Sequence, residues 1–138
     1  MILVSPGYGV YVMVKYIGKL SRKKVNELYG AARAGIVIYQ PAENHYESQP
    51  IKMFEYMAAG LPVVASDFPL WKYILEEAGC GICVNPTNAA EVKAACETLL
   101  FNPERSQEMG IRGRNAVLKQ YTWDTQAEEL LRLYKSIE

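Results

Sequence analysis

The sequence predicts an α/β domain in which a parallel β-sheet is flanked by helices on both faces. Short apolar runs typical of buried strands alternate with segments of helical periodicity, and few residues separate one element from the next. Crossover connections of this kind make the strands parallel, so their carboxyl ends meet at one edge of the sheet. Ligands bind beyond that edge, which directs attention to the loops over 18–20, 40–49 and 66–68.

The first expected elements lie before residue 35. Residues 2–5 and 10–17 are rich in Val, Ile and Tyr and are expected to form strands, the second of which ends at Gly18. A helix is expected to open at Ser21, because serine is a favourable N-cap residue. Its apolar face is formed at helical spacing by Val25, Leu28, Tyr29 and Ala32.

The middle of the chain is expected to form a buried strand over 36–39, a polar loop over 42–49 and a helix that begins at Pro50. Proline suits the first helical position, since its missing N–H group would be unpaired there in any case. The helix is expected to end near Gly60, because glycine readily adopts the left-handed conformation that closes a helix.

Two further strands, over 63–65 and 82–84, are expected on either side of a helix over 69–77. The aromatic residues of the chain fall on strand and helix faces. We therefore expect the tryptophans and tyrosines to pack in the core.

Three helices are expected to complete the chain. The first begins at Asn88, which forms with Glu91 a pattern similar to a capping box. The second begins after Asn102 and reaches about Gln120, and the third opens at Thr122. The apolar stripe of the third helix is formed by Ala127, Leu130, Leu131, Tyr134 and Ile137.

Composition fits a single domain and excludes some partners. The 138 residues are 50% apolar, enough for a core, and carry 15 basic and 15 acidic side chains. This balance argues against a nucleic-acid surface, which needs clustered positive charge. No apolar run reaches the length of a membrane span. We therefore expect a cytoplasmic protein. Whether the full-length protein lies at the inner face of the membrane is left open by the sequence.

The three cysteines are expected to be structural. Cys80 and Cys83 form a C-x-x-C pattern, which in redox proteins opens a helix, but here it runs from a turn into a strand. A closed zinc site needs four ligands, and Cys96 and the lone His45 are the other soft ligands of the chain. His45 is expected to be a surface residue of the polar loop rather than a catalytic base.

Two carboxylates and a helix start form the one constellation that indicates chemistry. Glu47 lies just before the helix that starts at Pro50, and Glu55 lies eight positions further on. Since Gln49 is a poor N-cap, the N–H groups that follow Pro50 are expected to be free to bind an anion such as a diphosphate. Those N–H groups belong to Ile51, Lys52 and Met53. On spacing alone, the favoured interpretation is that Lys52 and Glu55 form an ordinary surface pair.

The segment from Glu47 to Asp67 resembles the conserved motif of the group 1 glycosyltransferases, which are retaining enzymes of the GT-B architecture. Its elements are a Glu, seven residues, a second Glu, a helix end rich in small residues, then Gly60-Leu-Pro-Val and a strand. Asp67 to Trp71 resembles a variant found in polysaccharide- and capsule-assembling members. The likeness extends over about residues 10–138.

By this resemblance the chain would have a Rossmann-like sheet and would be the carboxyl-terminal, nucleotide-sugar-binding half of a GT-B fold. Glu55 would bind the ribose hydroxyls of the donor, and Glu47 would hold hydroxyls of the transferred sugar as the catalytic-site carboxylate. The backbone of Gln49, Pro50, Ile51 and Lys52 would meet the sugar and the diphosphate. The base would lie near Gly18, Lys19 and Leu20. The family needs no obligatory metal or other cofactor beyond the nucleotide-diphosphate sugar itself.

Two departures from the family pattern shape the expected function. The strand with which this domain of the family normally begins, and the loop after it that bears an Arg and a Lys for the phosphates, are not found before Met1, and the helix expected between Gly7 and Val10 is nearly absent. The domain that binds the acceptor is missing as well. We therefore expect residues 1–138 to be a single truncated domain, inactive alone. The acceptor, a glycan or a lipid-linked sugar, would be reached through the missing amino-terminal domain.

Two alternatives stay open. The chain could be a non-catalytic nucleotide-sugar-binding domain that acts with a separate amino-terminal half. It could also be another doubly wound domain, such as a sugar-nucleotide epimerase or a flavodoxin-like module. For an epimerase we would expect additional catalytic acids and histidines. The base, the sugar and the acceptor are likewise left open by these residues.

Overall fold

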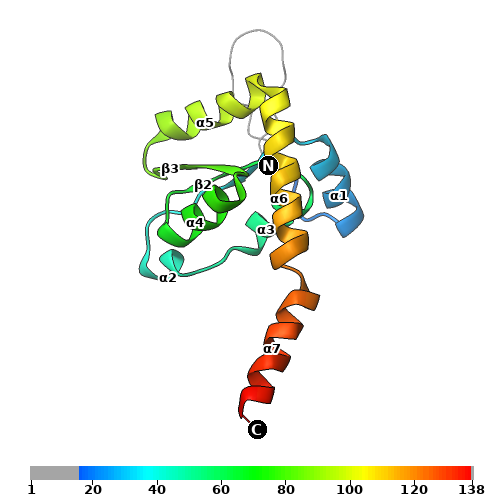
Figure 1. Cartoon of the computed structure of the whole chain (residues 1–138). Coiled ribbons are helices and arrows are strands. Elements are labelled where there is room, and N and C mark those ends of the chain that lie inside the picture. Colours follow the sequence, from blue (N-terminus) through cyan, green and yellow to red (C-terminus); the bar gives the residue numbers. More distant parts are fainter. Residues whose placement is uncertain (1–15, 138) are drawn as a thin grey trace.

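The computed structural model describes residues 16–137, and among them a three-stranded parallel sheet forms the centre of the fold (Figure 1). Its strands are β1 (Gly35–Val37), β2 (Val63–Ser66) and β3 (Gly81–Val84), in that order across the sheet. In β2, Val63 pairs with Gly35 on one side and with Gly81 on the other. The predicted α/β class with a parallel sheet is therefore confirmed.

Helices cover both faces of the sheet and connect its strands (Figure 1). They are α1 (Arg22–Ala31), α2 (Glu43–Tyr46), α3 (Ile51–Ala58), α4 (Pro69–Ala78), α5 (Ala89–Phe101), α6 (Pro103–Gln120) and α7 (Trp123–Ile137). The predicted helices over 69–77 and 103–120 and the three carboxyl-terminal helix starts are found within a residue or two. None of the helices between residues 16 and 137 has both the length and the apolar character that crossing a bilayer requires.

The alternation of side chains along β2 divides the core between the two faces. Val63 and Ala65 point to the face covered by α3 and α4, which contribute Met53, Met57 and Trp71 among others. Val64 points to the opposite face, where Ala95 and Leu99 of α5 cover it. All four residues of β2 are buried, and Val63, Val64 and Ala65 form a continuous apolar run rather than an alternating pattern.

Helix α6 links the two core layers by passing very close to the end of α3. Gly110 of α6 lies against the carbonyl group of Gly60, so closely that a Cβ atom at position 110 would overlap the carbonyl oxygen. One turn further on, a Cβ atom at Gly113 would lie 3.0 Å from Cβ of Cys80. Glycine is required at Gly60 for a different reason, because its φ of 74° closes α3 as predicted.

Four predicted elements need correction or fall outside the described residues. The strand predicted over 2–5 and most of the strand predicted over 10–17 lie outside them, and Tyr16 and Ile17 are not part of a strand. The strand predicted over 36–39 is shifted, since β1 ends at Val37. Part of the predicted loop over 42–49 forms the single-turn helix α2, although Ala42 provides no side-chain cap.

The cap predicted at Asn88 is present in a modified form. Its Oδ1 accepts hydrogen bonds from the N–H groups of Ala90 at 3.1 Å and Glu91 at 3.3 Å. The Glu91 carboxylate accepts in return from Asn88 Nδ2 and from the N–H group of Asn85, rather than from the Asn88 N–H group of a standard capping box. The cap therefore also fixes the turn that leaves β3.

Replacing Asn88 with alanine is expected to lower the free energy of unfolding by about 1 kcal/mol, because two N–H groups at the start of α5 lose their acceptor. Urea unfolding followed by circular dichroism measures the change. The matched control is Asn115→Ala on the exposed face of α6, where no loss is expected. Equal stability of Asn88→Ala and the wild type would contradict the role of the cap.

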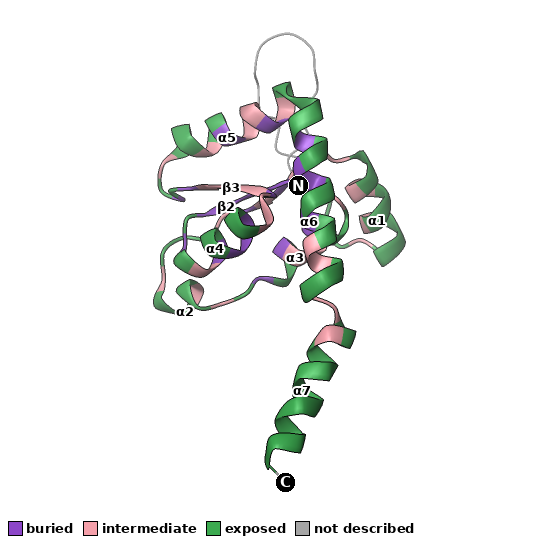
Figure 2. Cartoon of the chain, viewed as in Figure 1, coloured by how far each residue is buried: buried purple, intermediate pink, exposed green. Residues whose placement is uncertain are grey.

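Helix α7 extends away from the rest of the domain and none of its residues is buried (Figure 2). Trp123 is 88% exposed at its start, and Leu130, Leu131, Tyr134 and Ile137 are also exposed. The prediction that the tryptophans pack in the core is therefore correct for Trp71, which is 0% exposed, and wrong for Trp123. The predicted apolar stripe of this helix faces solvent in the described part of the chain.

Candidate functional site

The loop that leaves β1 is tied to the end of β2 by a buried serine. The hydroxyl group of Ser66 accepts a hydrogen bond from the N–H group of Tyr39 at 2.9 Å and donates one to its carbonyl oxygen at 3.0 Å. Ser66 is 0% exposed, so these bonds are shielded from water. They fix the start of the loop at the carboxyl edge of the sheet, where the sequence places the candidate site.

A cluster of aromatic rings supports the same loop from below. Phe68 and Trp71 pack edge to face with ring centroids 4.9 Å apart, and Tyr46 packs against Phe68 at the same distance. Trp71 Nε1 donates a hydrogen bond of 2.6 Å to the carbonyl group of Ser48. Glu47 lies between Tyr46 and Ser48, so its backbone is held on both sides while the residue itself is exposed.

His45 belongs to this supporting cluster. Its Nδ1 atom lies 2.8 Å from the carbonyl oxygen of Gln40, and its ring lies 5.1 Å from the ring of Tyr39. The residue is half-buried rather than at the surface, which corrects the prediction in part. These contacts give His45 a structural role in shaping the loop.

Helix α3 begins one residue later than predicted. Pro50 is the N-cap rather than the first helical residue, and its carbonyl group accepts a hydrogen bond from the N–H group of Met53 at 3.0 Å. The prediction that the Met53 N–H group is free is therefore wrong. No side chain caps the helix, so the N–H groups of Ile51 and Lys52 stand at the positive end of the helix dipole.

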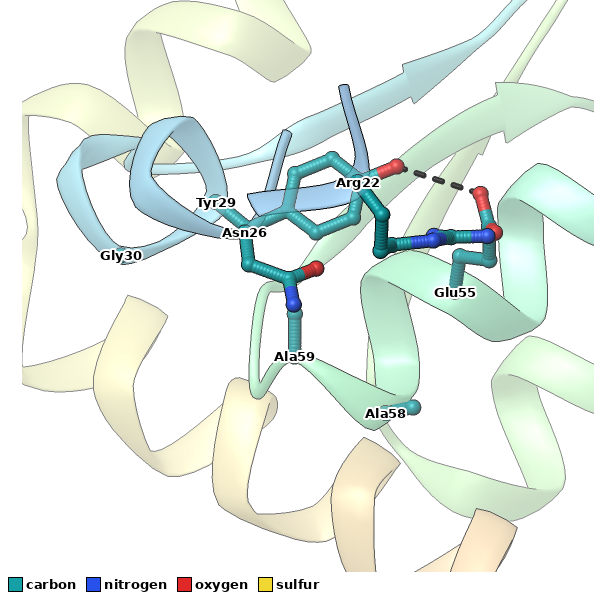
Figure 3. Close-up of a pocket in the computed structure, with 7 residues that line it drawn as sticks. All are labelled: Arg22, Asn26, Tyr29, Gly30, Glu55, Ala58 and Ala59. Atoms are coloured by element: carbon teal, nitrogen blue, oxygen red, sulfur yellow. Dashed lines mark hydrogen bonds and ion pairs between the residues drawn. The ribbon is translucent and has the colours of Figure 1, made fainter. Parts of the chain in front are cut away.

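Both oxygens of the Glu55 carboxylate receive hydrogen bonds from α1. Arg22 Nη1 donates to Oε1 at 2.8 Å, and the hydroxyl group of Tyr29 donates to Oε2 at 3.2 Å (Figure 3). The ion pair thus crosses from α1 to α3, instead of forming within α3 with Lys52 as the spacing allowed. The Glu55 side chain is 26% exposed, whereas that of Arg22 is 68% exposed.

These contacts shift the pKa values of the three groups in a consistent way. The hydrogen bond from Arg22 holds the pKa of Glu55 below its usual value, with further lowering by Tyr29 and by the charge of Lys52. Partial burial first, and the Glu55 charge second, raise the pKa of Tyr29 to about 12. Glu55 is therefore ionised and Tyr29 is a hydrogen-bond donor at neutral pH.

A pocket of about 410 Å³ opens between α1 and α3 beside this carboxylate (Figure 3). It is lined by Arg22, Asn26, Tyr29, Gly30, Glu55, Ala58 and Ala59. The α1 residues follow one another at positions i, i+4, i+7 and i+8, so they share one face of the helix. The pocket therefore combines one anionic group, several hydrogen-bond donors and a floor of small residues.

Glu55 is the one predicted site residue that lines this pocket. The other predicted site residues do not line the pocket. Most of them are exposed, namely Gly18, Lys19, Gln49, Ile51 at 76% and Lys52, while Leu20 is half-buried and Pro50 is buried. Gly18 has a φ of 77°, which bends the chain into the segment before α1.

Sequence reasoning missed Arg22, Asn26 and Gly30 and assigned Tyr29 to the apolar face of its helix. The sequence feature that these residues share is helical spacing, which starts at Arg22 in the first turn of α1 and places them on one face of the helix. The structure brings them to Glu55, and the apolar periodicity of α1 alone points to Val25 and Leu28 instead.

The cysteines are packing residues, as predicted. Cys80 is buried in the core beneath α6, and burial raises the pKa of its thiol to about 11. Burial likewise raises the pKa of Cys83 to about 11. Thiols of such high pKa are poor nucleophiles at neutral pH. In the part of the chain that the structure covers, His, Cys, Asp and Glu side chains form no group of three that could hold a metal ion.

The parallel sheet, its covering helices and the candidate site at its carboxyl edge define a Rossmann-like α/β domain. The chain belongs to the family described as Glycosyl transferases group 1, because residues 5–116 match that family.

Two curated proteins are similar to this chain in sequence. The α-maltose-1-phosphate synthase of Mycolicibacterium smegmatis is 28% identical over 124 residues, which are 86% of this chain and 31% of the relative. The phosphatidyl-myo-inositol mannosyltransferase of Mycobacterium leprae is 33% identical over 91 residues, which are 66% of this chain and 24% of the relative. The chain thus spans 31% or less of the length of these two proteins.

A solved structure shares the fold. The sucrose-phosphate synthase of Thermosynechococcus elongatus superposes with a TM-score of 0.76 over 89% of this chain and 30% of its own length. The two sequences are 24% identical, so this likeness concerns the fold.

Proposed function

We propose that the chain is the carboxyl-terminal, donor-binding half of a retaining glycosyltransferase that transfers a hexosyl group from a nucleotide-diphosphate sugar. The observation that carries the proposal is the ionised carboxylate of Glu55, held on α3 beside a pocket and eight positions after Glu47. Membership of the group 1 glycosyltransferases supports it. The names of the relatives, a mannosyltransferase and a maltose-1-phosphate synthase, favour a hexosyl group.

In this proposal, different residues in and around α3 bind different parts of the donor. Glu55 accepts hydrogen bonds from the ribose, and Glu47 holds hydroxyl groups of the transferred sugar. The N–H groups of Ile51 and Lys52 and the Lys52 charge stabilise the leaving diphosphate, while Gln49 and Pro50 shape the entry to the helix. The segment Gly18 to Leu20 lies near the base. As the resemblance implies, no metal is obligatory for this step.

The acceptor belongs to the other half of the proposed enzyme. A glycan or a lipid-linked sugar would bind between this domain and an amino-terminal domain, and closure of the two would exclude water and align the acceptor hydroxyl. The segment Asp67 to Trp71 supports a role in polysaccharide or capsule assembly through its resemblance to such members. We propose a cytoplasmic site of action, and no partner among nucleic acids, since the formal net charge is zero.

The test is ligand-observed NMR of the chain with uridine, guanosine and adenosine diphosphates. We expect selective binding of one nucleotide, and a loss of about ten- to a hundredfold in affinity in Glu55→Gln, because hydrogen bonds to a charged carboxylate are lost. Glu128→Gln on the exposed face of α7 is the matched control and should bind like the wild type. Unchanged binding by Glu55→Gln would refute the assignment of this residue.

The alternative is a nucleotide-sugar-binding domain without catalytic activity that acts with a separate amino-terminal chain. The exposed apolar side of α7 favours it, because a partner that covers Leu131 and Ile137 would remove this surface from water. Co-purification of this chain with a separately expressed amino-terminal half tests the alternative. Failure of the two to associate would count against it.

A further inference from the structure

We propose that Tyr29 and Arg22 are positioning residues, which hold the Glu55 carboxylate so that its two oxygens together accept a vicinal diol of the ligand. This inference rests on the proposed donor-binding function, in which Glu55 accepts the ribose hydroxyls, and extends it in one way. It assigns a role to two residues of α1 that the double-Glu motif does not include.

The hydrogen bonds of the carboxylate leave room for such a diol. A carboxylate offers about four acceptor positions, two on each oxygen. Arg22 occupies one position on Oε1, at 2.8 Å, and Tyr29 occupies one on Oε2, at 3.2 Å. Among residues 16–137, no other group donates to the carboxylate, so one position remains on each oxygen. Two hydroxyls on adjacent carbon atoms can each donate to one of these positions. A single hydroxyl has one O–H group and can fill only one of them.

The two donors hold the carboxylate by different means. The ring of Tyr29 packs edge to face on the ring of Tyr56, with centroids 5.4 Å apart, so the direction of its hydroxyl group is fixed by packing. Arg22 lies mostly in solvent and supplies charge, which together with Lys52 keeps Glu55 ionised. With both in place the carboxylate has little freedom to rotate. A ligand then binds without first having to order the Glu55 side chain.

The pocket between α1 and α3 lies beside the Glu55 carboxylate and its two donors. All three residues line it, together with Asn26, Gly30 and Ala58 (Figure 3). Its volume of about 410 Å³ accepts a ring-sized group beside the carboxylate. A sugar ring whose hydroxyls reach Glu55 can therefore rest against the small side chains of the pocket floor.

The experiment compares a nucleoside diphosphate with its 2′,3′-dideoxy form by calorimetry. For Tyr29→Phe we expect about a fivefold loss of affinity for the natural nucleotide, the worth of one hydrogen bond, and no change for the dideoxy form. Arg22→Met should show the same selective loss, and Arg22→Lys should recover part of it. The matched controls, Tyr134→Phe and Arg114→Met, are exposed residues outside the pocket and should bind both nucleotides like the wild type.

Two results of this comparison would overturn the inference. An equal loss for both nucleotides in Arg22→Met would mean that Arg22 contacts the phosphates or the base directly. Unchanged binding of both nucleotides by Tyr29→Phe would mean that its hydroxyl group does not position Glu55. Thermal unfolding of each variant shows that the comparison is made between folded proteins.

A second measurement separates this inference from the proposed function. The carboxyl carbon of Glu55, followed by NMR as a function of pH without nucleotide, should titrate at higher pH in Tyr29→Phe and in Arg22→Met. In the part of the chain that the structure describes, the charged and titratable groups that face it are Arg22 and Tyr29 of α1 and Lys52 of α3. If the titration moves to higher pH in these two variants while the wild-type protein binds no nucleotide, donor binding is refuted but the positioning role is kept. An unchanged titration would refute the positioning role whatever the chain binds.

Discussion

Replacing Gly110 with valine is expected to lower the free energy of unfolding by about 3 kcal/mol or more. Even the first side-chain carbon would overlap the carbonyl oxygen of Gly60, which belongs to the backbone and cannot turn aside as a side chain does. Helices α6 and α3 would have to separate, and the packing of Met57 beneath them would be lost. Such a loss is a large fraction of the stability of a small domain.

Urea unfolding of Gly110→Val measures this effect. The matched control is Gly30→Ala in α1, where, outside the local helix backbone, no atom of residues 16–137 lies within 4 Å of the added carbon. That variant is expected to gain up to about 1 kcal/mol, because alanine favours the helix over glycine. A Gly110→Val protein as stable as the wild type would show that α6 and α3 can move apart at no cost.

Replacing Trp71 with alanine is expected to cost about 3–5 kcal/mol, the range for large buried aromatic residues. Trp71 is 0% exposed and packs on both Phe68 and Tyr39. Its loss also leaves the carbonyl group of Ser48 without its donor, so the backbone on either side of Glu47 is released. The variant is thus expected to lose both stability and the order of the candidate site.

The exposed Trp123 provides the control for removing the buried Trp71. Trp123 is 88% exposed at the start of α7, and Trp123→Ala is expected to change the unfolding free energy by less than about 0.5 kcal/mol. Since the chain has two tryptophans, Trp123→Phe leaves Trp71 as the only indole fluorophore, and its emission should be that of a buried ring. Similar stability losses in the two alanine variants would contradict the described burial.

The regular elements of this fold could be predicted because local signals agree with the tertiary structure there. The apolar run of β2 and the glycine that ends α3 each specify one conformation, and the structure contains both. Helix α2 could not be predicted in the same way. Its four residues lack a cap and an apolar stripe, and contacts from Phe68, the N-cap residue of α4, and from Trp71 of α4 fix that segment instead.

The candidate site likewise has one part that the local sequence predicts and one part that it does not. The place of Glu55 on α3 follows from the motif and the helix start, which are close together in the sequence. Its hydrogen bonds to Arg22 and Tyr29 join positions 33 and 26 residues apart, so no local pattern contains them. The solvent exposure of Trp123 was missed for a related reason, because an amphipathic pattern tells which side of α7 is apolar but not whether anything packs on it.

The form of α7 has a consequence for how the chain unfolds. An isolated helix of its 15 residues is marginal in water, and α7 gains little from packing because none of its residues is buried. The folding cooperativity of the described chain therefore ends near Gln120, with the sheet and α3 to α6 as one unit. Helix α7 can fray and re-form many times while that unit remains intact.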